Sequence, residues 1–419
     1  GRRRRRNLVS GTLLAAAALA AVSVGARAGL SGQSTPSVGQ SAPSATQAPP
    51  GPASTAAPAT TGPPASTRAP AGGNTTAPTT TLPLGTIGSF EAVQVTGPSS
   101  AVVVGKGAIL VTRDAGRTWA RVWRGDAVLH DVNFSSATAG WALGEKTVLA
   151  TQDGGQHWRE LPEPAQTALR RVDFVSRGEG WGIAGGDGGQ TGEGPMPPSG
   201  RTRLVHTTDG GRTWSTLAAP AAPQSVCFSS AEDGWMASGT RVWRSTDGGR
   251  SWGRSPSFSL PVPAGGPPFR AELQCARPAA AWVNFSGGGA AAGHSPYALY
   301  TTRDGGSHWR GVLAEGGTLA TELRLPAGPG SAPGPFSVID PSHAFVLSPS
   351  PAAGSVGGVL AGDRLSAVPA IPDSRLQTPL SVGFASPTRG FVVGRDAAGR
   401  AVLLATGDGG RTWTRQLSS

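Results

Sequence analysis

The sequence has 419 residues, a formal net charge of +11, and a high content of glycine (63 residues) and proline (37 residues). Six arginines and no acidic residue fall within the first 28 positions, so the rest of the chain is only mildly basic. It contains no cluster of arginines interleaved with aromatic residues, which argues against nucleic-acid binding. The length allows two or three average domains, or one radial repeat domain.

Residues 1–28 have the layout of an export signal. Arg2 to Arg6 form a positive segment, Leu8–Val24 is an alanine-rich apolar core, and Ala26-Arg27-Ala28 offers a small-x-small cleavage site. An uncleaved membrane anchor is the alternative, although a usual span needs about 20 strongly apolar residues. We therefore expect an exported protein, secreted or held at the cell surface, that contacts the membrane only through this segment if the segment is uncleaved.

Residues 29–85 form a segment of different composition. Most of them are Ser, Thr, Pro, Ala and Gly, and Arg68 is the one charged residue within this segment. Such a segment cannot bury enough apolar surface to fold. The sequence predicts a disordered linker here, followed by a folded domain over 86–419.

The folded part repeats one eight-residue phrase six times, as in Thr207–Trp214. The Asp can accept hydrogen bonds from backbone N–H groups in a tight turn, and the Gly-Gly pair supplies positive φ angles. The Trp can plug the hairpin into an apolar layer. The first copy departs with Ala115-Gly116, and His157 and His308 replace the Thr before Trp in two others. We predict structural roles for Asp114, Trp119, Asp153, Trp158, Asp209, Trp214, Asp247, Trp252, Asp304, Trp309, Asp408 and Trp413.

A second phrase precedes each of these turns, with an apolar residue followed seven positions later by an aromatic or apolar one. Phe134 and Trp141 are an example, and weaker versions at Val95/Val102 and Val338/Phe345 bring the total to seven. Each unit therefore predicts a strand, a short turn, a second strand, a third strand that enters the Asp-containing turn, and a fourth strand after it. The turn missing from the sixth unit is expected near Val359–Asp363.

The eight-residue phrase resembles the Asp-box, or bacterial neuraminidase repeat. Together, the two phrases look most like the photosystem II stability/assembly factor propellers and their non-photosynthetic bacterial relatives. This resemblance implies an all-β propeller in which each box is a structural turn between the third and fourth strands of a blade, distant from any active site. Seven units of about 48 residues predict a seven-bladed β-propeller of four-stranded blades.

The two cysteines, Cys227 and Cys275, belong to neighbouring units. Cys275 stands at the Phe position of the fifth unit, and Cys227 stands one residue before that position in the fourth. Because neighbouring residues of a strand face opposite sides, the two thiols can meet across one gap between blades. We predict a disulfide, which an exported chain permits; two buried thiols are the alternative. No further Cys or His clusters near them, so we expect no metal and no cofactor.

Loop lengths indicate one working face. The turns between first and second strands and the box turns are uniform and should share a face, whereas loops lengthen on the opposite face at 185–201, 286–296, 348–358, 256–270 and 316–334. On that face, charged residues just before the Phe position should line the mouth of the central channel. The candidate binding residues are His130, Asp131, Arg170, Arg171 and Glu272, with Tyr297 free to stack on a ligand; solvated strand ends are the alternative.

The residues weigh against an enzyme. Sialidases resemble one another in an Arg triad, a Tyr nucleophile and an R-I-P phrase before the first box, and no such phrase precedes Asp114. Other glycosidases need two carboxylates about 5 to 9.5 Å apart, and Asp131 and Glu272 come from distant units. We therefore expect a non-catalytic, monomeric propeller that binds a protein or cell-envelope partner as an assembly or scaffold module. The alternative is a glycoside hydrolase or carbohydrate-binding protein that uses the loop face.

Overall fold

The computed structural model describes residues 85, 87–162, 168–185, 202–255, 258, 260, 269–276, 279–287, 295–315, 318–351 and 353–419. The expected signal (1–28), nearly all of the expected linker (29–85), and most of the long loops at 185–201 and 256–270 lie outside these residues. The described residues all belong to one compact unit, Thr75–Ser419. The one helix among the described residues, α1 (Thr318–Leu323), is short, and no helix in this part has the length and apolarity needed to cross a membrane.

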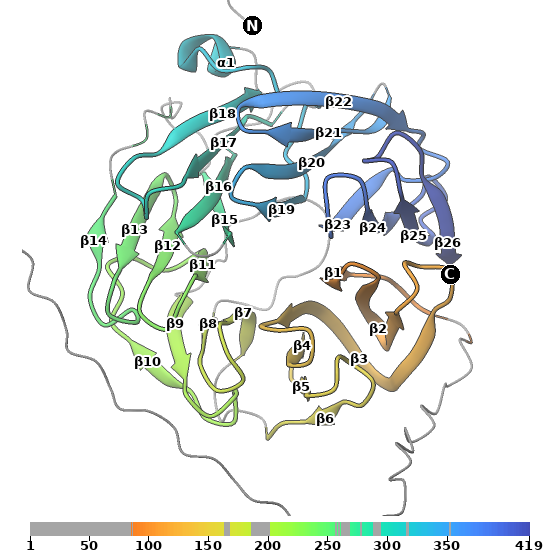
Figure 1. The fold of residues 1–419 in the computed structure, drawn as a ribbon, viewed down its shortest axis with the longest axis horizontal. Coiled ribbons are helices and arrows are strands. Elements are labelled where there is room, and N and C mark those ends of the chain that lie inside the picture. Colours follow the sequence, from red (N-terminus) through yellow and green to blue (C-terminus); the bar gives the residue numbers. More distant parts are fainter. Residues whose placement is uncertain are drawn as a thin grey trace, which may run out of the picture. The chain divides into compact units, whose positions relative to one another are not determined.

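Strand pairing groups the described strands into six antiparallel sheets, which Figure 1 shows arranged around a common centre. The first sheet has six strands: β1 (Ala92–Gly97), β2 (Ser100–Thr112), β3 (Ala120–Phe134), β4 (Gly140–Gly144), β5 (Val148–Thr151) and β6 (Arg159–Glu160). The second and third sheets are β7 (Leu169–Phe174), β8 (Gly180–Gly185), β9 (Thr202–Thr207) and β10 (Ser215–Leu217), then β11 (Ser225–Phe228), β12 (Gly234–Ser238), β13 (Arg241–Ser245) and β14 (Gly253–Arg254).

The remaining three sheets also have four strands each. They are β15 (Arg270–Ala276), β16 (Ala280–Ser286), β17 (Tyr297–Thr302) and β18 (Arg310–Glu315), then β19 (Phe336–Asp340), β20 (His343–Ser350), β21 (Gly354–Ala361) and β22 (Arg364–Ile371), and last β23 (Thr378–Phe384), β24 (Gly390–Arg395), β25 (Ala401–Thr406) and β26 (Thr414–Ser418). The expectation of an all-β propeller with four-stranded blades is therefore confirmed.

The prediction of seven blades is wrong, because the described strands form six sheets. The first part of β3 pairs with β2, up to Val128 opposite Lys106, and its last part pairs with β4, from Leu129 opposite Gly144. This long strand crosses from one sequence unit into the next without a break, so two units share the first sheet. Figure 1 shows β3 running from the outside of the ring to its centre.

Each of the seven phrases nevertheless forms an inner hairpin, and its first residue lies opposite the residue before the second. Four of these pairs join a Phe to a Gly, because the ring lies where a side chain on the facing residue would be: a Cβ on Gly234 would sit 2.3 Å from Phe228. The other three pairs join a smaller residue to an Ala. The pairs are Phe134–Gly140, Phe174–Gly180, Phe228–Gly234, Phe384–Gly390, Val95–Ala101, Cys275–Ala281 and Val338–Ala344.

A ring of side-chain links, which we call the inner ladder, ties the innermost strands together. We call the first residue of each phrase the Phe position. The residue just before it reaches across to the Phe position of the next inner strand. In five cases the side-chain oxygen of the preceding residue accepts a hydrogen bond from the backbone N–H at that Phe position. These bonds join Gln94 to Phe134 (2.7 Å), Asn133 to Phe174 (3.0 Å), Asp173 to Phe228 (2.5 Å), Gln274 to Val338 (3.0 Å) and Ser337 to Phe384 (3.0 Å).

The last sheet meets the first without exchanging a strand. At the corresponding ladder position the last sheet has Gly383, and the Val93 N–H instead donates to the Ser381 hydroxyl at 3.2 Å. Arg389 donates to the Pro98 carbonyl, and apolar residues of β1 and β2 pack against Phe391 and Val393. Side chains alone therefore close the ring.

The six Asp-boxes form the hairpins that we predicted. In the third box the Asp209 carboxylate accepts bonds from the Thr207 and Thr213 hydroxyls and from the Thr213 N–H, while the Trp214 indole N–H donates to the Gly211 carbonyl. His157 and His308 keep the same contact through Nδ1, 2.6 Å from the Asp of their box. The sixth unit retains a two-residue turn at Gly362-Asp363, as expected.

The acidity of the box carboxylates makes a pH dependence testable. Hydroxyl and backbone N–H donors from Ser251 and Thr412 hold the pKa of Asp247 and Asp408 at about 2. A carboxylate with a lowered folded-state pKa stabilises the fold above its unfolded pKa of about 3.9, and this contribution disappears as the pH falls toward 2. We expect a melting temperature that is level from pH 7 to 5 and falls between about pH 4 and 2, measured by circular dichroism. A main loss between pH 5 and 7 would contradict this origin.

Candidate functional site

The predicted cluster lies at the end of the ring where the inner strands begin. His130 and Asp131 are on β3, Arg171 is on β7 next to Arg170, and Glu272 is on β15. The structure brings Arg171 and Glu272 together, with Nη2 and Oε1 3.5 Å apart and each side chain about 40% exposed. This ion pair joins two strands that are not consecutive around the ring, since β11 lies between them in chain order.

Asp131 has a structural task that the sequence reasoning missed. Its carboxylate accepts bonds from the Val132 and Val172 backbone N–H groups. Ser225 and Ser381 occupy the equivalent place on β11 and β23, and they accept bonds from Leu273 and Val93 of the next inner strand. Asp131 therefore links β3 to β7 as these serines link their own pairs of strands.

The electrostatics of Asp131 follow from its burial. Burial raises the pKa of this carboxyl, and the nearby charges of Arg171 and His130 oppose that rise. Its Oδ2 atom is buried and has no hydrogen-bond partner. For Arg171, burial lowers the pKa, but Glu272 and Asp131 outweigh it and raise the pKa overall. The cluster is thus an arginine held between two carboxylates.

The sequence reasoning also missed Arg270. It lies two residues before Glu272 on β15, so the two side chains face the same side of the strand. Burial lowers the pKa of Arg270, Glu272 opposes this effect, and the charges of Arg171 and Arg170 add to it. The alternation of charged residues in Arg270–Glu272 was the signal that could have identified it.

His130 and Arg170 contact backbone. The Nε2 atom of His130 is 3.2 Å from the Arg170 carbonyl, and Arg170 Nε donates to the Gly185 carbonyl. Both residues therefore sit beside Asp131 and Arg171, as expected, but at least part of each side chain supports the local fold.

The expectation that Tyr297 is free to stack on a ligand is wrong. Its side chain is 4% exposed, and its hydroxyl lies 3.2 Å from the Gly330 carbonyl and 3.3 Å from the Ser348 hydroxyl. Burial raises the pKa of this hydroxyl to about 12. Tyr297 begins β17 and packs in a core cluster with residues of the next sheet, such as Phe336 and Val346.

A cavity of about 390 Å³ lies at the other end of the inner strands, where these strands lead into their first turns. Its wall includes inner-ladder residues such as Gln94, Asn133 and Asp173, with Asp340 and Cys275. The loop lengths predict a working face at the opposite end, so this cavity is a second candidate region. Among the described residues no group of His, Cys, Asp and Glu side chains is arranged to hold a metal ion.

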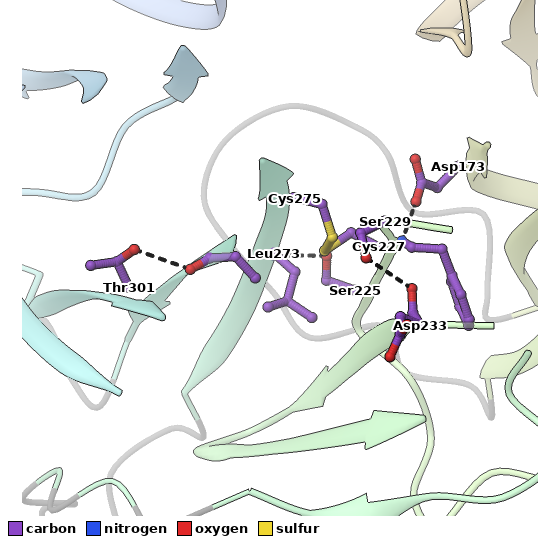
Figure 2. The surroundings of a disulfide bond; sticks show 10 residues. Asp173, Ser225, Cys227, Ser229, Asp233, Leu273, Cys275 and Thr301 are labelled. Carbon is purple, nitrogen blue, oxygen red and sulfur yellow. Dashed lines mark hydrogen bonds between the residues drawn. A yellow bond between two sulfur atoms is a disulfide. The ribbon is translucent and has the colours of Figure 1, made fainter. Parts of the chain in front are cut away.

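The predicted disulfide is present between Cys227 on β11 and Cys275 on β15, with Cα atoms 5.7 Å apart. Figure 2 shows it bridging the two strands, beside the Ser225–Leu273 hydrogen bond. Cys227 occupies the inner-ladder position and Cys275 the Phe position, so the disulfide replaces a hydrogen bond of the inner ladder. The pairing predicted from the alternation of side chains along a strand is confirmed.

Sequence comparison connects part of the chain with a known family. Residues 123–253 match the profile described as photosynthesis system II assembly factor YCF48. A 92-residue stretch is 34% identical to the photosystem II assembly lipoprotein Ycf48 of Synechococcus sp. (strain CC9902), and it covers 21% of this chain. The chain spans only 23% of the length of that relative in this match.

Two solved structures are similar to this chain. A GH74 enzyme of Niastella koreensis matches with a TM-score of 0.50 and 13% identity over 80% of this chain and 67% of the other. A structure of YCF48 bound to D1 peptide matches with a TM-score of 0.49 and 17% identity over 78% and 95%. At these identities the first similarity concerns the propeller architecture alone. The chain is thus a β-propeller, and it is similar in one segment to photosystem II assembly factors.

Proposed function

We propose that this chain is a non-catalytic propeller that binds a protein or cell-envelope partner and acts as an assembly or scaffold module at the cell envelope. The similarity of residues 123–253 to an assembly-factor family supports a protein-binding role. We further propose that it is exported as a monomer, with a signal or anchor at 1–28, a linker at 29–85 and the propeller at 86–419.

The observation that carries this proposal is how the candidate carboxylates are used. Asp131 accepts backbone bonds between β3 and β7, and Glu272 pairs with Arg171. A glycosidase needs one carboxyl group as an acid and a second as a base or nucleophile, both facing the sugar. Residues 171, 270 and 272 instead present alternating charges, which suit a polar, charged contact with a partner.

A photo-crosslinking experiment tests the partner. A benzophenone amino acid replaces Arg270 at the strand-start end in one variant and Arg254, on the outer strand β14, in the matched control. In intact cells we expect a discrete protein adduct from position 270 and none from position 254, because only the first lies beside the charged cluster. Equal adducts from both positions would contradict binding at this end of the ring.

The alternative, a glycoside hydrolase or carbohydrate-binding protein, has a separate test. The purified chain is incubated with plant, fungal and bacterial polysaccharides and with sialosides, and released reducing ends are measured. We expect no release. Release that Glu272→Gln abolishes, in a variant with unchanged melting temperature, would establish the hydrolase instead. Saturable polysaccharide binding without release would favour the carbohydrate-binding alternative.

A further inference from the structure

The cavity where the inner strands lead into their first turns reaches the disulfide. Cys275 lies in its wall, whereas Cys227 does not and is only 4% exposed. A volume of about 390 Å³ has room for a small organic thiol and none for a folded protein. Cys275 is therefore the residue of the bridge that borders the cavity, and Cys227 does not border it.

We propose that Cys227–Cys275 is a thiol–disulfide exchange site for low-molecular-weight thiols that enter through this cavity. A thiolate attacks the Sγ atom of Cys275, the bond between the two protein sulfurs breaks, and Cys227 leaves as a thiolate that takes up a proton. A second small thiol then attacks the mixed disulfide on Cys275. The products are two protein thiols and one small-molecule disulfide, so two electrons pass from the small thiols to the protein.

The charge of the cavity selects among thiols. Its described lining contains two carboxylates, Asp173 and Asp340, and no Lys, Arg or His. His343 Nδ1 lies 2.8 Å from Asp340, and Asp173 uses its Oδ2 to accept from the Phe228 N–H and also interacts with the charge of Arg171. The site therefore favours a cationic thiol over an anionic one.

Reduction removes one link of the inner ladder and leaves others in place. Between β11 and β15, the Ser225 hydroxyl still accepts from the Leu273 N–H, and the Gln224 side chain still accepts from the Ala271 N–H. The reduced propeller therefore stays folded, and the loss is confined to this gap between strands. Equivalent bonds elsewhere, such as that from Val338 to Gln274, are unaffected.

The test uses the native full chain and three thiols: cysteamine (cationic), 2-mercaptoethanol (neutral) and 2-mercaptoethanesulfonate (anionic). Reduction is followed by alkylation and mass spectrometry, and rates are compared per thiolate. We expect cysteamine to react about tenfold faster than the sulfonate at low salt, with less difference at high salt. The mixed disulfide should form on Cys275. Equal rates, or a first adduct on Cys227, would overturn the proposal.

Two controls separate the cavity from general accessibility. Asp173→Asn keeps the ladder bond, as Asn133 does at the equivalent place, and it should weaken the charge preference while leaving the neutral thiol unaffected. Thioredoxin, which cannot enter the cavity, should reduce the native chain much more slowly than it reduces the denatured chain. An unchanged preference in the variant, or rapid reduction by thioredoxin, would show that the cavity does not control access.

Hydrogen exchange then reports the structural effect. After reduction, the Leu273 and Ala271 amides should keep their protection, because their bonds to Ser225 and Gln224 remain, and the Phe174 amide, held by Asn133 across another gap, should not change either. Loss of protection throughout the ring would mean that the bridge is a general staple, and the proposal of a local exchange site would fail.

Discussion

Replacement of Trp181 by alanine is expected to lower the free energy of unfolding by about 3–5 kcal/mol, the range found when large buried aromatic side chains are removed. Trp181 is fully buried and stacks on Phe228 with ring centroids 3.6 Å apart. Its indole N–H donates to the Gly248 carbonyl in the box of the next sheet, at 3.0 Å. The substitution thus removes a contact between two sheets, and urea denaturation followed by tryptophan fluorescence and circular dichroism measures its cost.

Two variants show which part of Trp181 matters. Trp181→Phe keeps an aromatic ring against Phe228 and loses the hydrogen bond, so it should cost clearly less than the alanine variant. Trp123→Ala, at a partly buried site on β3, is the matched control and should also cost less. If Trp181→Ala were no more destabilising than Trp123→Ala, the stacked tryptophans would not hold neighbouring sheets together.

Gly234→Ala is expected to destabilise the protein by about 1–3 kcal/mol, the usual cost of overpacking. The new methyl group would lie 2.3 Å from a ring carbon of Phe228, and that ring is already held between Trp181 and the Trp252 indole. Gly253→Ala is the control, because a Cβ there meets only the Arg244 carbonyl, at 3.8 Å. Both variants are compared by urea denaturation, and the control should change stability by less than about 0.5 kcal/mol.

The repeats themselves suggest how to test this steric argument. Val95 faces Ala101 and Val338 faces Ala344, so a smaller residue at the Phe position accompanies alanine. In a double-mutant cycle, Gly234→Ala should therefore cost less in a Phe228→Val background than in the native protein. An equal cost in both backgrounds would mean that the glycine is needed for its backbone rather than for the ring.

Much of the fold could be predicted because the residues that form each hairpin lie within one unit of the sequence. The Asp-box is a local hydrogen-bonding device, so residues such as Asp209 and Trp214 reveal their structure within eight positions. The cysteines could be paired because their places in adjacent units fix which way each side chain points. The missing sixth box was also correctly placed: Gly362 donates to the Ser342 carbonyl, as Gly210 donates to Gly178 in an intact unit.

The contacts between units were harder to predict. Nothing in residues 120–134 marks an end between the outer strand of one unit and the inner strand of the next, and the fifteen residues form one strand. The stretch has no proline, and Gly125-Asp126 is its one glycine-containing dipeptide typical of turns. The contacts of Asp131 and Tyr297 could not be predicted for a related reason, since the groups that bond to their polar atoms, Val172 and Ser348, belong to distant segments.

The closure of the ring by side chains has a consequence for biosynthesis. Val93 and Ser381 are 288 residues apart in sequence, and at about 5–20 residues per second the ribosome needs roughly 15–60 s to supply the second after the first. During that time the apolar face of β1 and β2, with Val93 and Val103, has no partner, because Phe391 and Val393 have not been made. The nascent chain therefore exposes an aggregation-prone apolar surface through most of its own synthesis. We expect a chaperone to bind the chain at that stage.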